Sequence, residues 1–109
     1  MTYEVSYLPQ AEQDLIEILA YGIETWGEKL AEGMYLKITE QLETLYFSPN
    51  RTKKKGSLGT REMLISDSPY RAIIQIDEEA KRVFILRNLA YFEKYLIRLY
   101  AVYWQKKRL

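Results

Sequence analysis

Two residue types are missing from this chain, and each absence removes a class of chemistry. The 109 residues contain no cysteine, which excludes disulfides, thiolate zinc sites and thiol nucleophiles and fits a reducing compartment. They contain no histidine either, so the most common general base and transition-metal ligand is lacking. Any catalysis must therefore use Asp, Glu, Lys, Arg, Tyr, Ser or Thr.

Residues that interrupt regular structure are few, and no apolar run is long. Five glycines and three prolines among 109 residues, with 48% hydrophobic residues, predict a single folded domain over residues 1–109. The N-terminal stretch MTYEVSYLPQ lacks the basic and apolar regions of a signal peptide. No stretch approaches the roughly 18 apolar residues of a membrane span. We therefore expect a cytoplasmic protein that makes no membrane contact.

Acidic and basic residues are segregated along the chain, although the net charge is only +1. Residues 1–50 carry nine acids and two bases, a net charge of −7. Residues 51–109 carry fourteen bases and six acids, a net charge of +8. This asymmetry has two interpretations: a polyanionic partner binds the basic half, or the two halves attract each other across the fold.

The first half of the chain predicts a short strand and a helical hairpin. Residues 3–8 alternate as a strand does, with Tyr3, Val5 and Tyr7 on one face. Pro9 suits a first helical position, and Gly27 suits a helix end. Apolar residues then recur at helical spacing in two runs: Ala11, Leu15, Ile18, Gly22 and Trp26, then Ala31, Met34, Ile38, Leu42 and Leu45.

The second half predicts a basic loop and an antiparallel meander. Residues 48–60 lack periodicity and carry Arg51 and the run Lys53, Lys54 and Lys55, so we expect a loop there. Strands are expected at residues 61–66, 70–76 and 82–88, joined by short turns. Residues 91–109 again show helical spacing and end in a basic stretch. This tail is either a packing helix or an apolar stripe that awaits a partner chain.

Strand alternation assigns the side chains of the last hairpin to two faces. We expect Ala72, Ile74 and Ile76 to face the helices, together with Phe84 and Leu86. The other face then carries Arg71, Ile73, Gln75, Val83, Ile85 and Arg87. The sequence thus predicts an α+β fold, in which a helical hairpin packs on a small, mostly antiparallel sheet with element order β-α-α-β-β-β and a C-terminal helix.

The order and spacing of several motifs resemble the RelE/ParE superfamily of bacterial toxins. The helical hairpin contains AEQDLIEILAYGIETWG at residues 11–27, and the closing hairpin contains YRAIIQIDEEAKRVFIL at residues 70–86, followed by YFEKY at 91–95. The resemblance covers nearly the whole chain. It implies a cytoplasmic toxin of a type II toxin–antitoxin pair, held inactive by a cognate antitoxin in a hetero-oligomer. RelE-like members cut mRNA at the ribosome, and ParE-like members poison DNA gyrase without catalysing a reaction.

The chain contains only some of the catalytic residues that a RelE-like endoribonuclease would need. The resemblance matches Arg71 to a phosphate-stabilising arginine and Tyr95 to the acid or base of the tail, and Arg61 could add a cation. The RelE pattern has two lysines on the strand before Tyr70-Arg71, where this chain has Glu62 and Leu64. The loss of these cations favours a ParE-like toxin over an mRNA endoribonuclease. A binding module that has lost toxicity is a third interpretation.

For target or nucleic-acid binding, the sequence offers a set of cations and no metal site. The candidate binding residues are Lys53, Lys54, Lys55, Arg61, Arg71 and Arg87. Asp77, Glu78 and Glu79 lie together in a hairpin turn without the ligand spacing of a calcium loop, so we expect no metal. We expect no cofactor.

Overall fold

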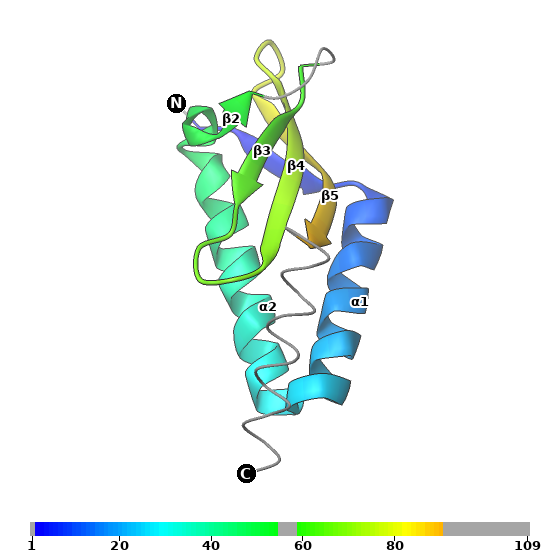
Figure 1. Cartoon of the computed structure of the whole chain (residues 1–109). Coiled ribbons are helices and arrows are strands. Elements are labelled where there is room, and N and C mark those ends of the chain that lie inside the picture. The colour runs from blue at the N-terminus through cyan, green and yellow to red at the C-terminus, as the bar shows by residue number, and fades with distance from the viewer. Residues whose placement is uncertain (1, 55–58, 91–109) are drawn as a thin grey trace.

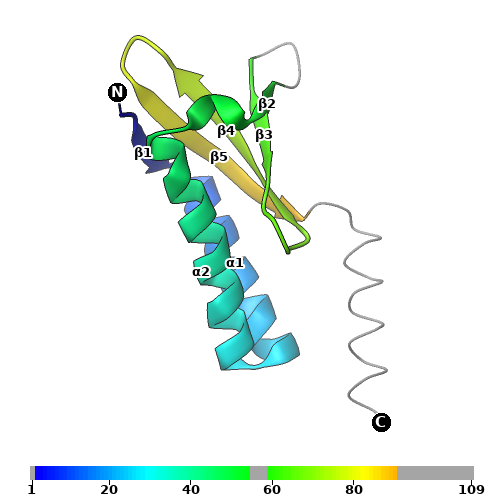
Figure 2. The same ribbon diagram turned by 90° about the vertical axis from the view of Figure 1, so that its left-hand side faces the viewer.

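The helical hairpin covers one face of a curved, mixed sheet, and no other helix of the described residues lies on the opposite face (Figure 1; Figure 2). The computed structural model describes residues 2–54 and 59–90. Within these residues the predicted α+β class and element order are confirmed. The C-terminal helix predicted at residues 91–109 lies outside the described residues.

The two helices are those that the apolar spacing predicts. Helix α1 spans Pro9–Trp26 and helix α2 spans Glu28–Glu43. Gly27 joins them with a φ of 91°, a conformation that suits glycine, and its N–H donates to the Ile23 carbonyl at 3.1 Å. The helices also approach each other closely at Gly22, because a Cβ placed there would lie 3.0 Å from Ala31 Cβ.

The sheet has five strands in the order β1-β5-β4-β3-β2. Its strands are β1 (Glu4–Tyr7), β2 (Lys53–Lys54), β3 (Arg61–Leu64), β4 (Tyr70–Asp77) and β5 (Arg82–Ala90). β1 pairs in parallel with β5, and the other neighbours are antiparallel. The short strand β2 and a 3-10 turn at Pro49–Arg51 fall inside residues 48–60, which were predicted as a loop throughout.

The predicted faces of β5 were wrong over its first half. Val83 and Ile85 are fully buried and pair across the sheet with Ile76 and Ile74, so they face the helices. Phe84 therefore points to the face opposite to α1 and α2, where Val83 and Ile85 were expected. The cause is the register, which is set by the four-residue turn from Glu78 to Lys81 and by an irregularity between Ile73 and Ile74.

The hydrophobic core lies between the helices and the covered face of the sheet. Its fully buried large side chains are Ile38, Leu42, Leu45, Ile74, Val83 and Ile85. Tyr3 is buried against this core, with Val5 and Tyr7 packed beside it, as the alternation in β1 predicted. Among residues 2–54 and 59–90, no helix has both the length and the apolar composition needed to cross a membrane.

Candidate functional site

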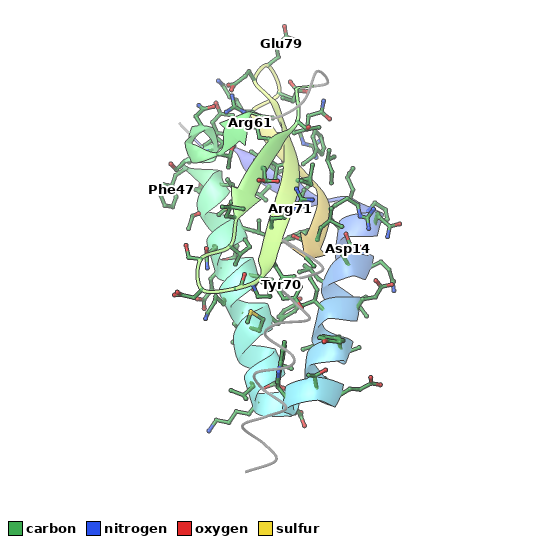
Figure 3. All side chains as sticks on the ribbon, viewed as in Figure 1. Asp14, Phe47, Arg61, Tyr70, Arg71 and Glu79 are labelled. Carbon is green, nitrogen blue, oxygen red and sulfur yellow. The ribbon has the colours of Figure 1, made fainter. Side chains whose placement is uncertain are left out.

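The face of the sheet opposite to α1 and α2, called the open face below, carries a partly buried ion pair between β3 and β4. In register, Glu62 opposes Ile73 and Leu64 opposes Arg71, so these four side chains share that face. Figure 3 labels Arg71 on the sheet. Arg71 Nη1 donates to a carboxylate oxygen of Glu62. Glu62 is only 8% exposed, whereas the Arg71 side chain is 31% exposed. The sequence predicts phosphate binding by the Arg71 guanidinium, but in the structure this guanidinium binds the Glu62 carboxylate.

Arg61 does not join this pair. It opposes Ile74 on the covered side of the sheet, and it neighbours Glu62 along β3, so the two side chains leave the strand on opposite faces. Its Nη1 donates to the Thr52 carbonyl at 3.0 Å. The structure therefore brings Arg71 together with Glu62 and does not bring Arg61 and Arg71 into one constellation.

Arg87 is held at the edge of β5 by a carboxylate from helix α1. Its Nε and Nη2 donate to the two oxygens of Asp14 at 2.8 and 3.1 Å. The Asn88 backbone N–H donates to Asp14 Oδ2 at 2.9 Å, and Asn88 Nδ2 donates to the Ala11 carbonyl at 3.2 Å. Asp14 thus takes the hydrogen bond that a neighbouring strand would take, beyond the point where β1 ends. The sequence predicts that Arg87 is available on the open face. In the structure its guanidinium instead binds Asp14 and links α1 to the sheet.

The Asp14–Arg87 pair favours the charged form of both groups. Burial alone would raise the pKa of the Asp14 carboxyl, but the hydrogen bonds from Arg87 and from the Asn88 backbone outweigh it and lower that pKa below its ordinary value. The Asp14 carboxylate in turn raises the pKa of the Arg87 guanidinium.

The two remaining cations of residues 59–90 also have partners. Lys81 Nζ lies 3.8 Å from a Glu78 oxygen and 5.2 Å from the centre of the Tyr3 ring. Arg82 Nη2 lies 3.2 Å from a Glu4 oxygen, and its guanidinium lies 5.4 Å from the Phe84 ring centre. Arg82 and Arg87 belong to the basic half of the chain, residues 51–109, and their partners Glu4 and Asp14 belong to the acidic half, residues 1–50. Attraction between the two halves thus accounts for part of the charge asymmetry.

Several predicted site residues cannot be placed. Lys55 and Tyr95 lie outside the described residues. Lys53 and Lys54 form β2 by their backbone, and their side chains are outside what the structure describes. Within residues 2–54 and 59–90, no group of three or more acidic side chains is arranged to hold a metal ion. Asp77 ends β4, and Glu78 and Glu79 lie in the turn that follows it.

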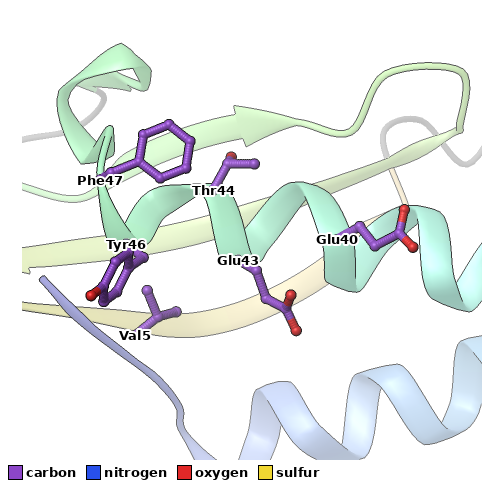
Figure 4. Close-up of a pocket in the computed structure, with 6 residues that line it drawn as sticks. All are labelled: Val5, Glu40, Glu43, Thr44, Tyr46 and Phe47. Atoms are coloured by element: carbon purple, nitrogen blue, oxygen red, sulfur yellow. The ribbon is translucent and has the colours of Figure 1, made fainter. Parts of the chain in front are cut away.

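A hollow at the end of α2 was missed by sequence reasoning (Figure 4). Its volume is about 640 Å³, and it is lined by Val5, Glu40, Glu43, Thr44, Tyr46 and Phe47. Tyr46 is 51% exposed and Phe47 68% exposed. Two adjacent exposed aromatic residues were the available signal, since TLYFSP follows the last helical position directly. The hollow combines carboxylates with aromatic rings, which suits a partner segment that carries both apolar and basic side chains.

A second hollow lies nearby, between α1 and α2. Its volume is about 540 Å³, and Glu43 lines both hollows. The other lining residues are Tyr7, Glu12, Leu15, Ile16, Tyr35 and Thr39. Burial, with the charge of Glu43 next in importance, raises the pKa of Tyr7 to about 12, so its phenol stays protonated at neutral pH. This side of the molecule is acidic and aromatic, and all the residues that line the two hollows belong to the acidic first half of the chain.

The arrangement of the described elements matches a known toxin family. Residues 5–87 match the family described as ParE toxin of type II toxin-antitoxin system, parDE. The chain belongs to this family. A comparison with curated proteins gives no match.

Solved structures of related toxins share the fold of this ParE-family toxin. The chromosomal ParDE system of P. aeruginosa superposes with a TM-score of 0.74 at 21% identity, covering 83% of this chain and 97% of that one. The archaeal RelE–RelB complex of Pyrococcus horikoshii OT3 gives 0.62 at 18% identity, with 85% and 99% covered. The RelBE2 complex of Mycobacterium tuberculosis gives 0.60 at 21% identity, with 83% and 99% covered. At these identities the similarity establishes the fold.

Proposed function

We propose that this toxin acts as ParE-like toxins do, by binding DNA gyrase, and that it does not cleave RNA. The observation that carries the proposal is the pairing of the described C-terminal cations. Arg71, Lys81, Arg82 and Arg87 each lie against a carboxylate, and Arg61 donates to a backbone carbonyl. A surface built in this way supports contact with a protein better than contact with a chain of phosphates.

The chemistry of RNA cleavage supports the same choice. Attack of a 2′-hydroxyl on the neighbouring phosphate needs a base, an acid and cations that stabilise the charge developing on the phosphate oxygens. One positioned donor of this kind is worth about 100-fold or more in rate. The Arg71 guanidinium donates a hydrogen bond to Glu62, and the Arg61 side chain leaves β3 on the opposite face of the sheet. The RelE-like alternative keeps Arg71 and Tyr95 as its working residues, and it would need Glu62 to release the arginine.

We further propose that a cognate antitoxin neutralises this toxin in a cytoplasmic hetero-oligomer. The similar M. tuberculosis structure was solved as a toxin–antitoxin complex, and the P. horikoshii structure as a RelE–RelB complex. In this chain, the two hollows that share Glu43 offer exposed aromatic and aliphatic side chains, with Tyr46, Phe47 and Ile16 among them. Exposed apolar groups that adjoin carboxylates suit an amphipathic antitoxin segment.

Two assays on the same purified toxin test the proposal. The first measures supercoiling of relaxed plasmid by gyrase, and the second maps mRNA ends by primer extension after incubation with translating ribosomes. We expect inhibited supercoiling that the antitoxin relieves, together with intact mRNA. Cuts at the ribosomal A site that disappear in Arg71→Ala and Tyr95→Phe would overturn the proposal in favour of the endoribonuclease. Activity in neither assay would instead indicate a binding module without toxicity.

A further inference from the structure

The position of Glu62 is unusual for a carboxylate, because it is buried on the face of the sheet opposite to helices α1 and α2. Glu62 is 8% exposed, and it lies on β3 beside Leu64, which is 49% exposed. Burying a carboxylate costs free energy unless a cation and hydrogen bonds compensate for the lost hydration. Arg71 supplies that compensation from β4. An apolar residue at position 62 would avoid this cost.

The guanidinium of Arg71 is only partly used by this contact. Nη1 donates to Glu62, whereas Nε is buried and has no hydrogen-bond partner among the residues that the structure describes. A guanidinium binds carboxylates and phosphates by the same fork of N–H donors. The Glu62 carboxylate therefore occupies the place that a phosphate oxygen would take, and its charge repels any other anion that approaches the open face.

From this geometry we infer that Glu62 is a specificity-determining residue that closes the open face of the sheet to phosphate groups. While Glu62 is charged, Arg71 cannot bind the phosphates of an RNA backbone. Other surfaces of the toxin must therefore bind its target. Neutralising Glu62 exposes a latent anion site made by the Arg71 guanidinium. The inference concerns what the open face excludes, so it does not depend on gyrase being the target.

The test compares two variants that change the net charge equally. Glu62→Gln keeps the shape and an acceptor oxygen but removes the charge beside Arg71. Glu79→Gln removes a charge from the exposed turn between β4 and β5. Binding of a fluorescently labelled oligouridylate is measured by anisotropy over a range of salt concentrations.

At about 50 mM salt, we expect Glu62→Gln to bind the oligouridylate about fivefold to tenfold more tightly than the unmodified protein. The slope of log affinity against log salt concentration should be steeper by about 0.7, which is the value for one added phosphate contact on a single strand. Glu79→Gln should resemble the unmodified protein. Adding Arg71→Gln to Glu62→Gln should remove the gain. Equal binding by the Glu62→Gln and Glu79→Gln proteins, or a gain that survives the loss of Arg71, would overturn the inference.

A second pair of variants covers the case in which Glu62→Gln does not fold, which thermal melts would reveal. Arg71→Gln and Arg82→Gln each remove one positive charge from a pair with a glutamate. If Glu62 already neutralises Arg71, both variants change oligouridylate binding by the same small amount. A loss of affinity in the Arg71→Gln protein several times larger than in the Arg82→Gln protein would show that Arg71 is open to phosphate, and the inference would be wrong.

Discussion

Replacing Asp14 with alanine is expected to unfold a large share of the molecules at temperatures where the unmodified toxin is stable. Asp14 is 5% exposed and accepts three hydrogen bonds, two from Arg87 and one from the backbone N–H of Asn88. Its loss frees α1 from the edge of β5 over the stretch where β1 no longer pairs. The perturbation is local, because alanine favours the helix and leaves α1 itself intact.

The magnitude follows from how well water can replace each lost bond. The Arg87 side chain is 44% exposed, so water can solvate its guanidinium and the loss of the ion pair costs about 1 kcal/mol at most. Asn88 is buried, and a buried N–H left without a partner costs about 1–3 kcal/mol. We expect a decrease of about 3 kcal/mol in the free energy of unfolding, which lowers Tm by about 15 °C in a domain of this size.

The assay is urea unfolding followed by circular dichroism, with Glu17→Ala as the matched control. Glu17 lies on the same helix with an exposed side chain, so its replacement should change the free energy of unfolding by less than about 0.5 kcal/mol. Since the folded-state pKa of Asp14 is lowered, its contribution is complete above about pH 4 and is lost as the pH falls through the folded-state value. The difference between the Asp14→Ala and unmodified proteins should therefore shrink in acid. A difference below about 0.5 kcal/mol at pH 7 would refute this account of the α1–β5 contact.

Two further predictions each compare one substitution with a control substitution. Gly22→Val should lower the free energy of unfolding by about 1–3 kcal/mol in thermal melts, because its side chain meets Ala31. The side chain of Gly33→Ala meets nothing within 4 Å, so this control should raise the free energy of unfolding by about 0.5–1 kcal/mol. Equal effects of the two substitutions would contradict the close approach of α1 and α2 at Gly22. Phe47→Ser should weaken antitoxin binding at least tenfold in calorimetry without changing Tm, since the ring is exposed. Leu30→Ser, at the other end of the hairpin, is its control, and equal losses in both would exclude the hollow as the docking site.

Local patterns predicted the helical hairpin well because its determinants are local. The spacing of Ala11, Leu15 and Gly22 reports which side of α1 is buried, and Gly27 marks the turn regardless of what packs nearby. The alternation over residues 3–8 likewise placed Tyr3, Val5 and Tyr7 on one face, and all three pack in or against the core. Each of these predictions needed only neighbours within one element.

The errors concern pairings between distant segments. Alternation shows that Phe84 and Ile85 point to opposite faces, but only the register with β4 decides which of them is covered. The partner of Arg87 is Asp14, 73 residues earlier in the sequence, and no spacing rule connects the two. The contact between Glu62 and Arg71 also depends on the β3–β4 register. The cations could thus be found in the sequence, whereas their neutralisation could not.

The parallel pairing of β1 with β5 has a consequence for how the toxin is made. β1 is synthesised before both helices, yet its partner begins only at Arg82, so Glu4 cannot form its ladder until the helices, β3 and β4 have all been translated. Pairing across such a separation closes a long loop and is slow compared with the formation of the helical hairpin. A nascent chain therefore carries a folded hairpin whose core-facing side has no sheet to cover it, and the sheet that bears Arg71 and Glu62 is completed only after β5 has been synthesised.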